Sequence, residues 1–534
     1  MGRTPDLEID VHRPVGAALV QDYLSESGEA GTFFAGRFDA FGSFEAKAEE
    51  VAGRFDRAAR ERAAAAMTAP DGADPARLTR FVEDGGFVVT TGQQPGLFGG
   101  PLYSIHKGLT AVRLAESLEA RLGVPVIPLF WVASDDHDWA EANHTHIVGL
   151  DNELHRIELD APDPSVTPPL HRIAMGAQIE DSVEAFVRCL PDTDFSADFV
   201  ALLRRSFTPE ATLPEAYEAM LRHLLGRFGL YFTDAAHPVV KEVSGPALLE
   251  ELAAAPRMEE VLRATATDLE QAGYALQVPI LEGGANLFLE GPAGRERLYS
   301  EDGGYRLRTS GELLSAEDVR ARFEGDPSVL SPNVLFRPVV ESLVFPTLSY
   351  VGGPGEMAYF AQLGAYFEAH GVRMPVVFPR WAATPVESKI RKVLDKFDLE
   401  IGRLQQPFHE LAGEIAREEM PADVRAALGK LRGTVGQGVS DLQTVTQPLD
   451  STLKGPVQHV RSQAFAALDE LERKIVAAVK RESEIALSQL EKARVHLFPE
   501  GKPAERVHSP FYFLARYGDG FLDALHERFS VDLK

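Results

Sequence analysis

Cysteine is almost absent from this sequence. Cys189 is the only cysteine among 534 residues, so the chain can form neither an internal disulfide nor a metal site built from several thiolates. Cys189 lies in the stretch AFVRCLPD, which indicates a buried, small apolar side chain more than a catalytic thiol. The composition therefore excludes the disulfide-rich secreted folds and the cysteine-rich zinc domains.

Long apolar runs are missing as well. No stretch approaches the roughly 20 consecutive apolar residues that span a bilayer, and the N-terminal residues MGRTPDLEIDVHRP lack the apolar core of a signal peptide. Hydrophobic residues make up 45% of the chain and charged residues 25%, as in ordinary soluble globular proteins. We therefore expect a cytoplasmic protein with no membrane partner.

Positive charge is scarce over most of the chain. The sequence has 54 Lys and Arg against 80 Asp and Glu, a formal net charge of -26. Residues 381–534 hold 22 basic and 23 acidic side chains, or -1, which leaves -25 for the first 380 residues. Because an acidic surface repels a polyanion, we expect no nucleic-acid partner. The change in charge also places a domain boundary near residue 381.

Residues 1–380 alternate short apolar runs with helical segments. This alternation predicts an α/β domain, a Rossmann-like parallel sheet core with insertions at about 150–215 and 235–330. The clearest strands are predicted at residues 86–92, 124–134, 229–234, 344–353 and 374–379. Open sheets of this kind bind ligands beyond the carboxyl ends of their strands, so candidate site residues are sought there.

The C-terminal part of the chain predicts helices only. Apolar residues recur every three or four positions at 386–415 and again at 468–479, on either side of a stretch punctuated by glycine and proline at 433–456. We expect two long helices that return on each other as an antiparallel coiled coil within residues 381–498, with a kink at Pro407. A two-helix arm leaves apolar surface exposed, which predicts a homodimer.

The tail at residues 499–534 mixes basic and aromatic side chains. It contains the stretch PEGKPAERVHSPFYFLARYG. We expect this tail to pack back on the core. A second pocket, for a nucleotide or an effector, is the alternative.

A strand, a glycine-rich turn and a helix are predicted at residues 87–117, FVVTTGQQPGLFGGPLYSIHKGLTAVRLAES. In many α/β proteins this order presents backbone N–H groups and a helix N-terminus to an anion. Neither standard phosphate motif is present, since there is no G-x-x-x-x-G-K-[ST] and no G-x-G-x-x-G. We nevertheless expect Lys107 and the backbone of residues 96–100 to hold a phosphate or a developing negative charge.

Polar side chains surround the predicted turn. Tyr103, His106 and Lys107 are three and four residues apart on the helix, so they can point together toward the mouth of the turn. Gln93 and Gln94, at the strand end, supply hydrogen-bond donors and acceptors for a polar ligand. A solvated helix face is the alternative for the three helical residues, but the neighbouring glutamines favour a binding site.

Three aspartates, Asp135, Asp136 and Asp138, lie within four residues at the end of the second predicted strand. Their mutual repulsion is costly unless the negative charge is used. A substrate ammonium, a Mg²⁺ ion that bridges phosphates, and proton transfer through His137 are the candidate uses, with Asp136, His137 and Asp138 as catalytic residues. Zinc is an alternative because more histidines follow, but the HEXXH spacing is missing. We expect no tightly bound metal.

A third group of candidates surrounds the fourth predicted strand. Arg337 precedes this strand, Tyr350 lies near its end, and Gly353 lies in the GGPGE turn that follows. Glu356 follows in the first turn of the next helix, where it either complements the helix dipole or faces a ligand beside open glycine backbone. Arg380 ends the last strand, where its fork can bind a carboxylate or phosphate or can form an ion pair at the domain junction.

Four stretches together carry a family resemblance. TTGQQPGLFGGPLYSIHKGLT, PLFWVASDDHDWAEANH, SYVGGPGEMAYFAQLG and PEGKPAERVHSPFYFLARYG, in this order, resemble the bacillithiol biosynthesis cysteine-adding enzyme family, BshC. The resemblance implies a Rossmann-like core similar to class I aminoacyl-tRNA synthetases, with insertions and a C-terminal coiled coil. It also implies a ligase that adds cysteine to glucosaminyl malate and so completes bacillithiol, a low-molecular-weight thiol.

The resemblance also implies a set of ligand-facing positions. They are Gln93, Gln94, Tyr103, Lys107, Asp136, His137, Asp138, Tyr350, Gly353 and Glu356. The sequence departs from the family pattern at Asp135, where glutamate is expected, and at His106, where tyrosine is expected. The resemblance leaves open whether ATP and Mg²⁺ are used.

Two other functions remain open at this point. A class I synthetase-like nucleotidyltransferase that acts on another small carboxylate is one, although no HIGH or KMSKS signature is present. A non-catalytic coiled-coil scaffold with a ligand-sensing domain is the other. The concentration of acidic and polar residues at strand ends argues against a scaffold, because a scaffold has no need to hold like charges together.

Overall fold

The computed structural model describes residues 7–161, 163, 165–301, 303–482 and 484–534. The chain forms two compact units. Unit 1 consists of Met1–Pro385 and Glu505–Lys534, and unit 2 consists of Val386–Ala504. The chain thus leaves unit 1 once and returns to it for the last segment.

The centre of unit 1 is a five-stranded sheet with the order β13-β12-β2-β3-β6, in which every neighbouring pair is parallel. Its strands are β2 (Phe87–Gln93), β3 (Val126–Val132), β6 (Tyr231–Asp234), β12 (Thr347–Gly352) and β13 (Val376–Pro379). The Rossmann-like parallel core predicted from the sequence is confirmed. Numbered by position in the chain, the strands follow the order 3-2-1-4-5 of dinucleotide-binding folds. The order reverses between β2 and β12, and ligands of such sheets bind at that point.

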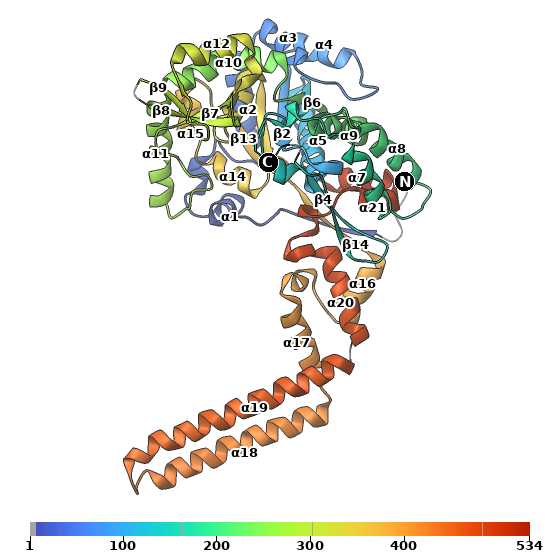
Figure 1. The fold of residues 1–534 in the computed structure, drawn as a ribbon, viewed down its shortest axis with the longest axis vertical. Helices are drawn as coiled ribbons and strands as arrows, with labels where there is room; N and C mark the ends of the chain where they lie inside the picture. The colour runs from blue at the N-terminus through green and yellow to red at the C-terminus, as the bar shows by residue number, and fades with distance from the viewer. Residues whose placement is uncertain (1–6, 162, 164, 302, 483) are drawn as a thin grey trace. The chain divides into compact units, whose positions relative to one another are not determined.

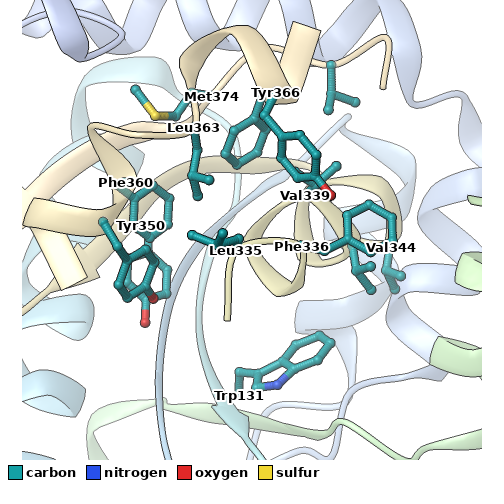
Figure 2. Packing of buried hydrophobic residues seen from close by; sticks show 14 of the residues in the cluster. Trp131, Leu335, Phe336, Val339, Val344, Tyr350, Phe360, Leu363, Tyr366 and Met374 are labelled. Carbon is teal, nitrogen blue, oxygen red and sulfur yellow. The ribbon is translucent and has the colours of Figure 1, made fainter. Parts of the chain in front are cut away.

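Helices cover both faces of this sheet (Figure 1). They include α2 (Phe41–Arg54), α5 (Tyr103–Leu122), α13 (Arg337–Val344) and α14 (Pro354–Phe360). Side chains alternate along a strand, so Val88 joins one core with Trp131 and Tyr350, while Val89 joins another with α2 and α5. Figure 2 shows the first core, in which Tyr350 stacks on Phe360 with ring centroids 4.7 Å apart. Burial on both faces fixes the strand register.

The segments between the central strands carry additional structure. Between β3 and β6 lie the hairpin β4 (His144–Val148) and β5 (Leu154–Glu158), followed by α7 (Gln178–Val187) and α8 (Ser196–Ser206). Cys189, just after α7, is buried. Between β6 and β12, an antiparallel sheet with the order β10-β9-β8-β7-β11 follows two helices, α10 (Pro238–Ala253) and α11 (Ala255–Gln271). We call this second sheet the insertion sheet.

The strands of the insertion sheet reach the central sheet at its carboxyl edge. They are β7 (Gly284–Gly291), β8 (Gly294–Glu301), β9 (Gly304–Leu307), β10 (Leu313–Leu314) and β11 (Leu330–Pro332). A tight turn joins β7 to β8, with Gly291 opposite Gly294. Because β11 leads directly into α13 and then β12, the insertion sheet stands beside the ligand-binding end of the core.

The last segment of the chain packs against the start of α5. The N–H group of Leu102 donates to the carbonyl of His508 at 2.8 Å, and the N–H group of Phe41 donates to the carbonyl of Lys534 at 2.9 Å. Two short helices, α21 (Phe511–Tyr517) and α22 (Gly520–Arg528), lie between these contacts. Residues 505–534 are therefore an integral part of unit 1.

Unit 2 is helical and contains a long antiparallel helix pair. Its helices are α16 (Ser388–Lys396), α17 (Phe408–Glu418), α18 (Ala422–Thr446), α19 (Lys454–Glu482) and α20 (Glu484–Leu497). In Figure 1, α18 and α19 run side by side, with Gln458 bonded to Gln443 near their loop and Arg432 paired with Asp469 farther along. The predicted antiparallel coiled coil is confirmed. Over the residues that the structure describes, no helix has the length and apolar character needed to cross a membrane.

The residues that form this pair differ from the prediction. The stripe at 386–415 is not one helix, because it is broken at Asp398, whose φ of 49° is left-handed. Pro407 precedes α17 and does not kink a longer helix. The first long helix is α18, which includes several glycines of the stretch predicted as a break. Each glycine costs a helix about 1 kcal/mol, and packing on α19 offsets this cost. Pro456 is tolerated because it lies in the first turn of α19.

Candidate functional site

A cavity of about 490 Å³ opens at the carboxyl ends of β2, β3 and β12, where the strand order reverses. Among the described residues that line it, six are lysine or arginine and three are aspartate or glutamate. The cationic residues are Lys107, Arg295, Arg297, Arg337, Arg380 and Arg506, and the acidic ones are Asp135, Asp136 and Glu356. A cationic cavity in a chain of net charge -26 indicates anionic ligands.

Lys107 is on the first turns of α5, and its side chain reaches the carboxyl end of β2. Its Nζ donates to the carbonyl of Gly92 at 2.8 Å and to Oε1 of Gln93 at 2.8 Å. It also lies 2.6 Å from Oε2 of Glu356, although the lysine side chain is only 4% exposed. Gln93 in turn donates to the hydroxyl of Tyr103 at 3.0 Å, and burial raises the pKa of Tyr103 to about 12. Lys107 therefore fixes both the strand end and the glutamate opposite it.

Glu356 joins the helix α14 to this network. Its Oε2 accepts from the N–H group of Gly353 at 2.8 Å, and its Oε1 accepts from the hydroxyl of Tyr350. Burial acts to raise the pKa of Glu356, but the ammonium of Lys107 and these hydrogen bonds outweigh it and hold the pKa below its ordinary value. Glu356 thus bonds to the N-terminus of α14 and also lines the cavity, so its position agrees with both interpretations.

Arg337 begins α13 and extends the network toward the core. Its Nη1 donates to Glu341 at 2.9 Å, and its Nη2 donates to the hydroxyls of Tyr359 at 2.9 Å and Tyr350 at 3.3 Å. Thr90 of β2 donates to the same buried Glu341. The network therefore connects β2, β12, α13 and α14 under one side of the cavity.

The aspartate cluster separates into different contacts. Asp135 is buried and lies 3.3 Å from the ammonium of Lys241. Asp136 accepts from the N–H group of His137 at 2.7 Å and lies 3.6 Å from Arg295. Burial acts to raise the pKa of Asp136, but His137 and Arg295 together lower it below its ordinary value. Asp136 is therefore ionised at neutral pH, and Lys241 and Arg295 relieve the expected repulsion.

The orientation of His137 follows from its arginine neighbour. Nη1 of Arg295 lies 3.0 Å from Nδ1 of His137. A guanidinium can only donate to Nδ1, whereas the Asp136 carboxylate, 3.4 Å from the same nitrogen, can only accept from it. His137 is therefore held between a cation and an anion at the cavity, a position that suits proton transfer.

Two predicted site residues do not line the cavity. Asp138 is exposed and caps α6 (Trp139–Ala142), where it accepts from the N–H group of Glu141 at 3.0 Å. His106 is fully buried, and its Nδ1 lies 2.9 Å from Oε2 of Glu505. Tyr103 and Lys107 are four residues apart on α5 and share a face, whereas His106 is turned toward the tail. The structure therefore does not bring Asp138 and His106 to the cavity with the other predicted residues.

Arg380 lines the cavity, but its fork is occupied. Its two terminal nitrogens pair with both oxygens of Glu505, at 2.8 and 2.6 Å, and only 2% of the side chain is exposed. Burial acts to raise the pKa of Glu505, but Arg380 and His106 lower it strongly. Of the two roles open to Arg380, the structure shows the ion pair.

The glycine turn does not form an anion cradle. Residues 96–100 are buried and do not line the cavity. The N–H group of Gly99 donates to the carbonyl of Gly96 at 3.1 Å, and that of Gly100 to Leu97 at 3.0 Å. A Cβ atom on Gly96 would lie 2.7 Å from Cα of Gly100, so the glycines allow a tight turn. Of the turn region, Gly92, Gln93 and Gln94 reach the cavity, and Gln94 donates to the carbonyl of Asp138 at 3.1 Å.

Sequence reasoning missed three arginines of the lining. Arg295 and Arg297 come from β8 of the insertion sheet, and Arg506 comes from the tail that returns after unit 2. The stretch RER at 295–297 is basic in an otherwise acidic part of the chain, which was the available signal. In the part of the chain that the structure describes, no group of three His, Cys, Asp or Glu residues is placed to hold a metal ion. The absence of a tightly bound metal stays a prediction.

Comparisons with known proteins point to one family over most of the chain. Residues 7–381 match the family model of the bacillithiol biosynthesis BshC N-terminal Rossmann-like domain, and residues 383–532 match that of the BshC C-terminal coiled-coil domain. A relative from Salinibacter ruber is 31% identical over 83% of this chain and 81% of its own length. One from Koribacter versatilis is 30% identical over 85% and 84%. Both carry the name "Putative cysteine ligase BshC".

Proposed function

The chain belongs to the BshC family, and from that premise we propose that it is an amide-forming ligase that joins L-cysteine to glucosaminyl malate, the last step of bacillithiol biosynthesis. The observation that carries the proposal is the cationic cavity at the switch point of an otherwise acidic protein. Cysteine supplies one carboxylate and glucosaminyl malate supplies two, so both substrates need cationic surroundings. The names of the relatives support the type of reaction.

The reaction forms a carbon–nitrogen bond between the cysteine carboxyl group and the sugar amine. One carboxylate oxygen must leave with an activating group, and the amine must lose a proton. Asp136 is ionised and suits the ammonium group of cysteine, while His137, between Arg295 and Asp136, is placed for proton transfer. Lys107 contributes positive charge and holds Gln93 and Glu356 in place.

We propose ATP with Mg²⁺ as the source of activation. Arg506 is exposed at the cavity and has no acidic partner among the described residues, so it is suited to hold phosphate oxygens. Asp136 would be the carboxylate available to Mg²⁺ if the ion enters beside it. Bound ATP would convert the carboxylate oxygen into a leaving group.

The reaction can be tested directly. Purified protein incubated with cysteine, glucosaminyl malate and ATP-Mg²⁺ should form the cysteinyl amide, which mass spectrometry detects as the sum of both substrates less one water. The same spectra distinguish release of AMP from release of ADP. Omission of each component in turn gives the controls. Failure to form the amide from cysteine in any activated form would show that the proposed function is wrong.

We also propose that unit 2 mediates a homodimer. Large apolar side chains are exposed along the helix pair and its loop, at Leu431, Leu442, Val445, Leu449, Val460 and Leu471. Light scattering should report about twice the chain mass of 58.4 kDa, because burial of this surface between two copies removes apolar area from water. Leu442→Glu with Val445→Glu should give the monomer, whereas Leu313→Glu, at an exposed position of the insertion sheet, should not. A wild-type monomer at micromolar concentration would contradict the dimer.

A further inference from the structure

Most cations of the cavity already have acidic partners. The pairs are Lys107 with Glu356 at 2.6 Å, Arg337 with Glu341 at 2.9 Å, Arg380 with Glu505 at 2.6 Å and Arg295 with Asp136 at 3.6 Å. Arg297 differs, because no carboxylate pairs with it among the described residues. Arg506 also lacks one, but Arg506 is exposed and water can solvate it, whereas Arg297 is half-buried.

One nitrogen of the Arg297 guanidinium is hydrogen-bonded to the protein, and its two terminal nitrogens are open to a ligand. Arg295 and Arg297 are two residues apart on β8, so their side chains leave the same face of the insertion sheet. Nε of Arg297 donates to the carbonyl of Ala285 at 3.1 Å, and a Cβ atom on Gly284 would lie 3.2 Å from this Nε. The two terminal nitrogens of Arg297 have no acceptor among the described residues. The guanidinium is therefore oriented before any ligand arrives.

A half-buried guanidinium without a counter-ion is unfavourable. Burial lowers the pKa of Arg297, and only the hydroxyls of Tyr299 and Tyr366, with no carboxylate, oppose that effect. By contrast, Asp135 and Asp136 act on Arg295 in the opposite sense to burial. A bound anion would offset the cost of desolvating Arg297, and a carboxylate matches the two parallel donors of an arginine fork.

We propose that Arg297 is a specificity-determining residue that binds a malate carboxylate of glucosaminyl malate. This assignment rests on the proposed function. The cysteine carboxylate is a poorer occupant, because it must be activated and attacked, and a bidentate ion pair would stabilise it in the ground state. The malate carboxylates do not react. An ion pair with one of them therefore positions the sugar amine without stabilising the reacting groups in the ground state. The insertion sheet thereby selects the amine substrate.

Arg297→Gln tests the assignment, with Arg320→Gln as the matched control at an exposed position of α12 (Ala316–Gly325) that does not line the cavity. Isothermal calorimetry should show that Arg297→Gln weakens glucosaminyl malate binding about tenfold or more, the usual scale for hydrogen bonds to a charged group. The KM for glucosaminyl malate should rise while the KM for cysteine stays within about twofold. Arg297→Lys keeps the charge but loses the fork, so it should recover only part of the affinity.

Malate alone is the second probe, and it separates the two hypotheses. If the wild type binds malate but forms no amide, and Arg297→Gln abolishes the binding, then Arg297 binds a carboxylate as proposed. The proposed ligase reaction would then be wrong. If the wild type forms the amide and Arg297→Gln matches Arg320→Gln in every constant, then the proposed reaction is supported and the assignment of Arg297 is wrong. The assignment also falls if the wild type binds neither malate nor glucosaminyl malate.

Discussion

Asp136→Asn should lower the rate of amide formation roughly 100-fold, because it removes one electrostatic contributor without changing the size of the side chain. The substitution also leaves Arg295 without its nearest charge partner and changes the acceptor of the His137 N–H group. Steady-state kinetics at saturating cysteine and glucosaminyl malate measure the effect, and circular dichroism verifies the fold. Near-wild-type turnover of this variant would show that Asp136 does not contribute to the reaction.

Asp138→Asn is the informative comparison for Asp136→Asn. The sequence pattern predicts a catalytic role for both aspartates, but the structure places Asp138 at an exposed helix cap outside the cavity. Asparagine is also a good N-cap residue, so the helix should tolerate it. We therefore expect turnover within about threefold of wild type for Asp138→Asn, which is small beside the loss at Asp136. Equal losses at both positions would favour the sequence-based view of the cluster.

Lys107→Ala should also lower turnover roughly 100-fold. The substitution deletes the positive charge that Glu356 faces at 2.6 Å and frees the side chain of Gln93. Because loss of one partner from a buried ion pair costs about 3–5 kcal/mol of stability, thermal melting must confirm that the assayed protein is folded. Lys502→Ala, at an exposed position of unit 2, should leave turnover unchanged.

A double substitution separates the two roles of Lys107. If Lys107 acts only by holding Glu356, then adding Lys107→Ala to Glu356→Gln should not lower turnover further. If Lys107 also stabilises charge in the transition state, the double variant should be slower than Glu356→Gln alone. Near-wild-type turnover in folded Lys107→Ala would exclude both roles.

The core of the fold could be predicted because its signals are local. Each central strand is an apolar run that ends in glycine, proline or acid, and a strand buried on both faces needs such a run. The strand ends also predicted where the cavity would open, since parallel strands bring their carboxyl ends to one edge. Gln93, Tyr103, Lys107, Asp136, His137, Tyr350 and Glu356 all meet there.

Other predictions failed where local pattern and tertiary packing disagree. Helical spacing placed His106 near Lys107, but a difference of one position on a helix turns a side chain by about 100°, and His106 contacts Glu505 instead. The glycine turn resembled an anion cradle, yet its N–H groups bond within the turn. The glycines of α18 looked like a break, but a partner helix outweighs their low helix propensity.

The sequence by itself determined the Rossmann-like core, the presence of a coiled coil, the acidic balance and the family. Only the tertiary structure decided which charges face the ligand. Arg297 comes from an insertion roughly 160 residues after Asp136, and Arg506 lies a further 200 or so residues along, beyond the whole of unit 2. No local periodicity relates such distant positions, because their proximity depends on how the sheet, the insertion and the returning tail pack together. Whether an arginine is paired or open is likewise a property of its neighbours in space, as Arg380 and Arg297 show.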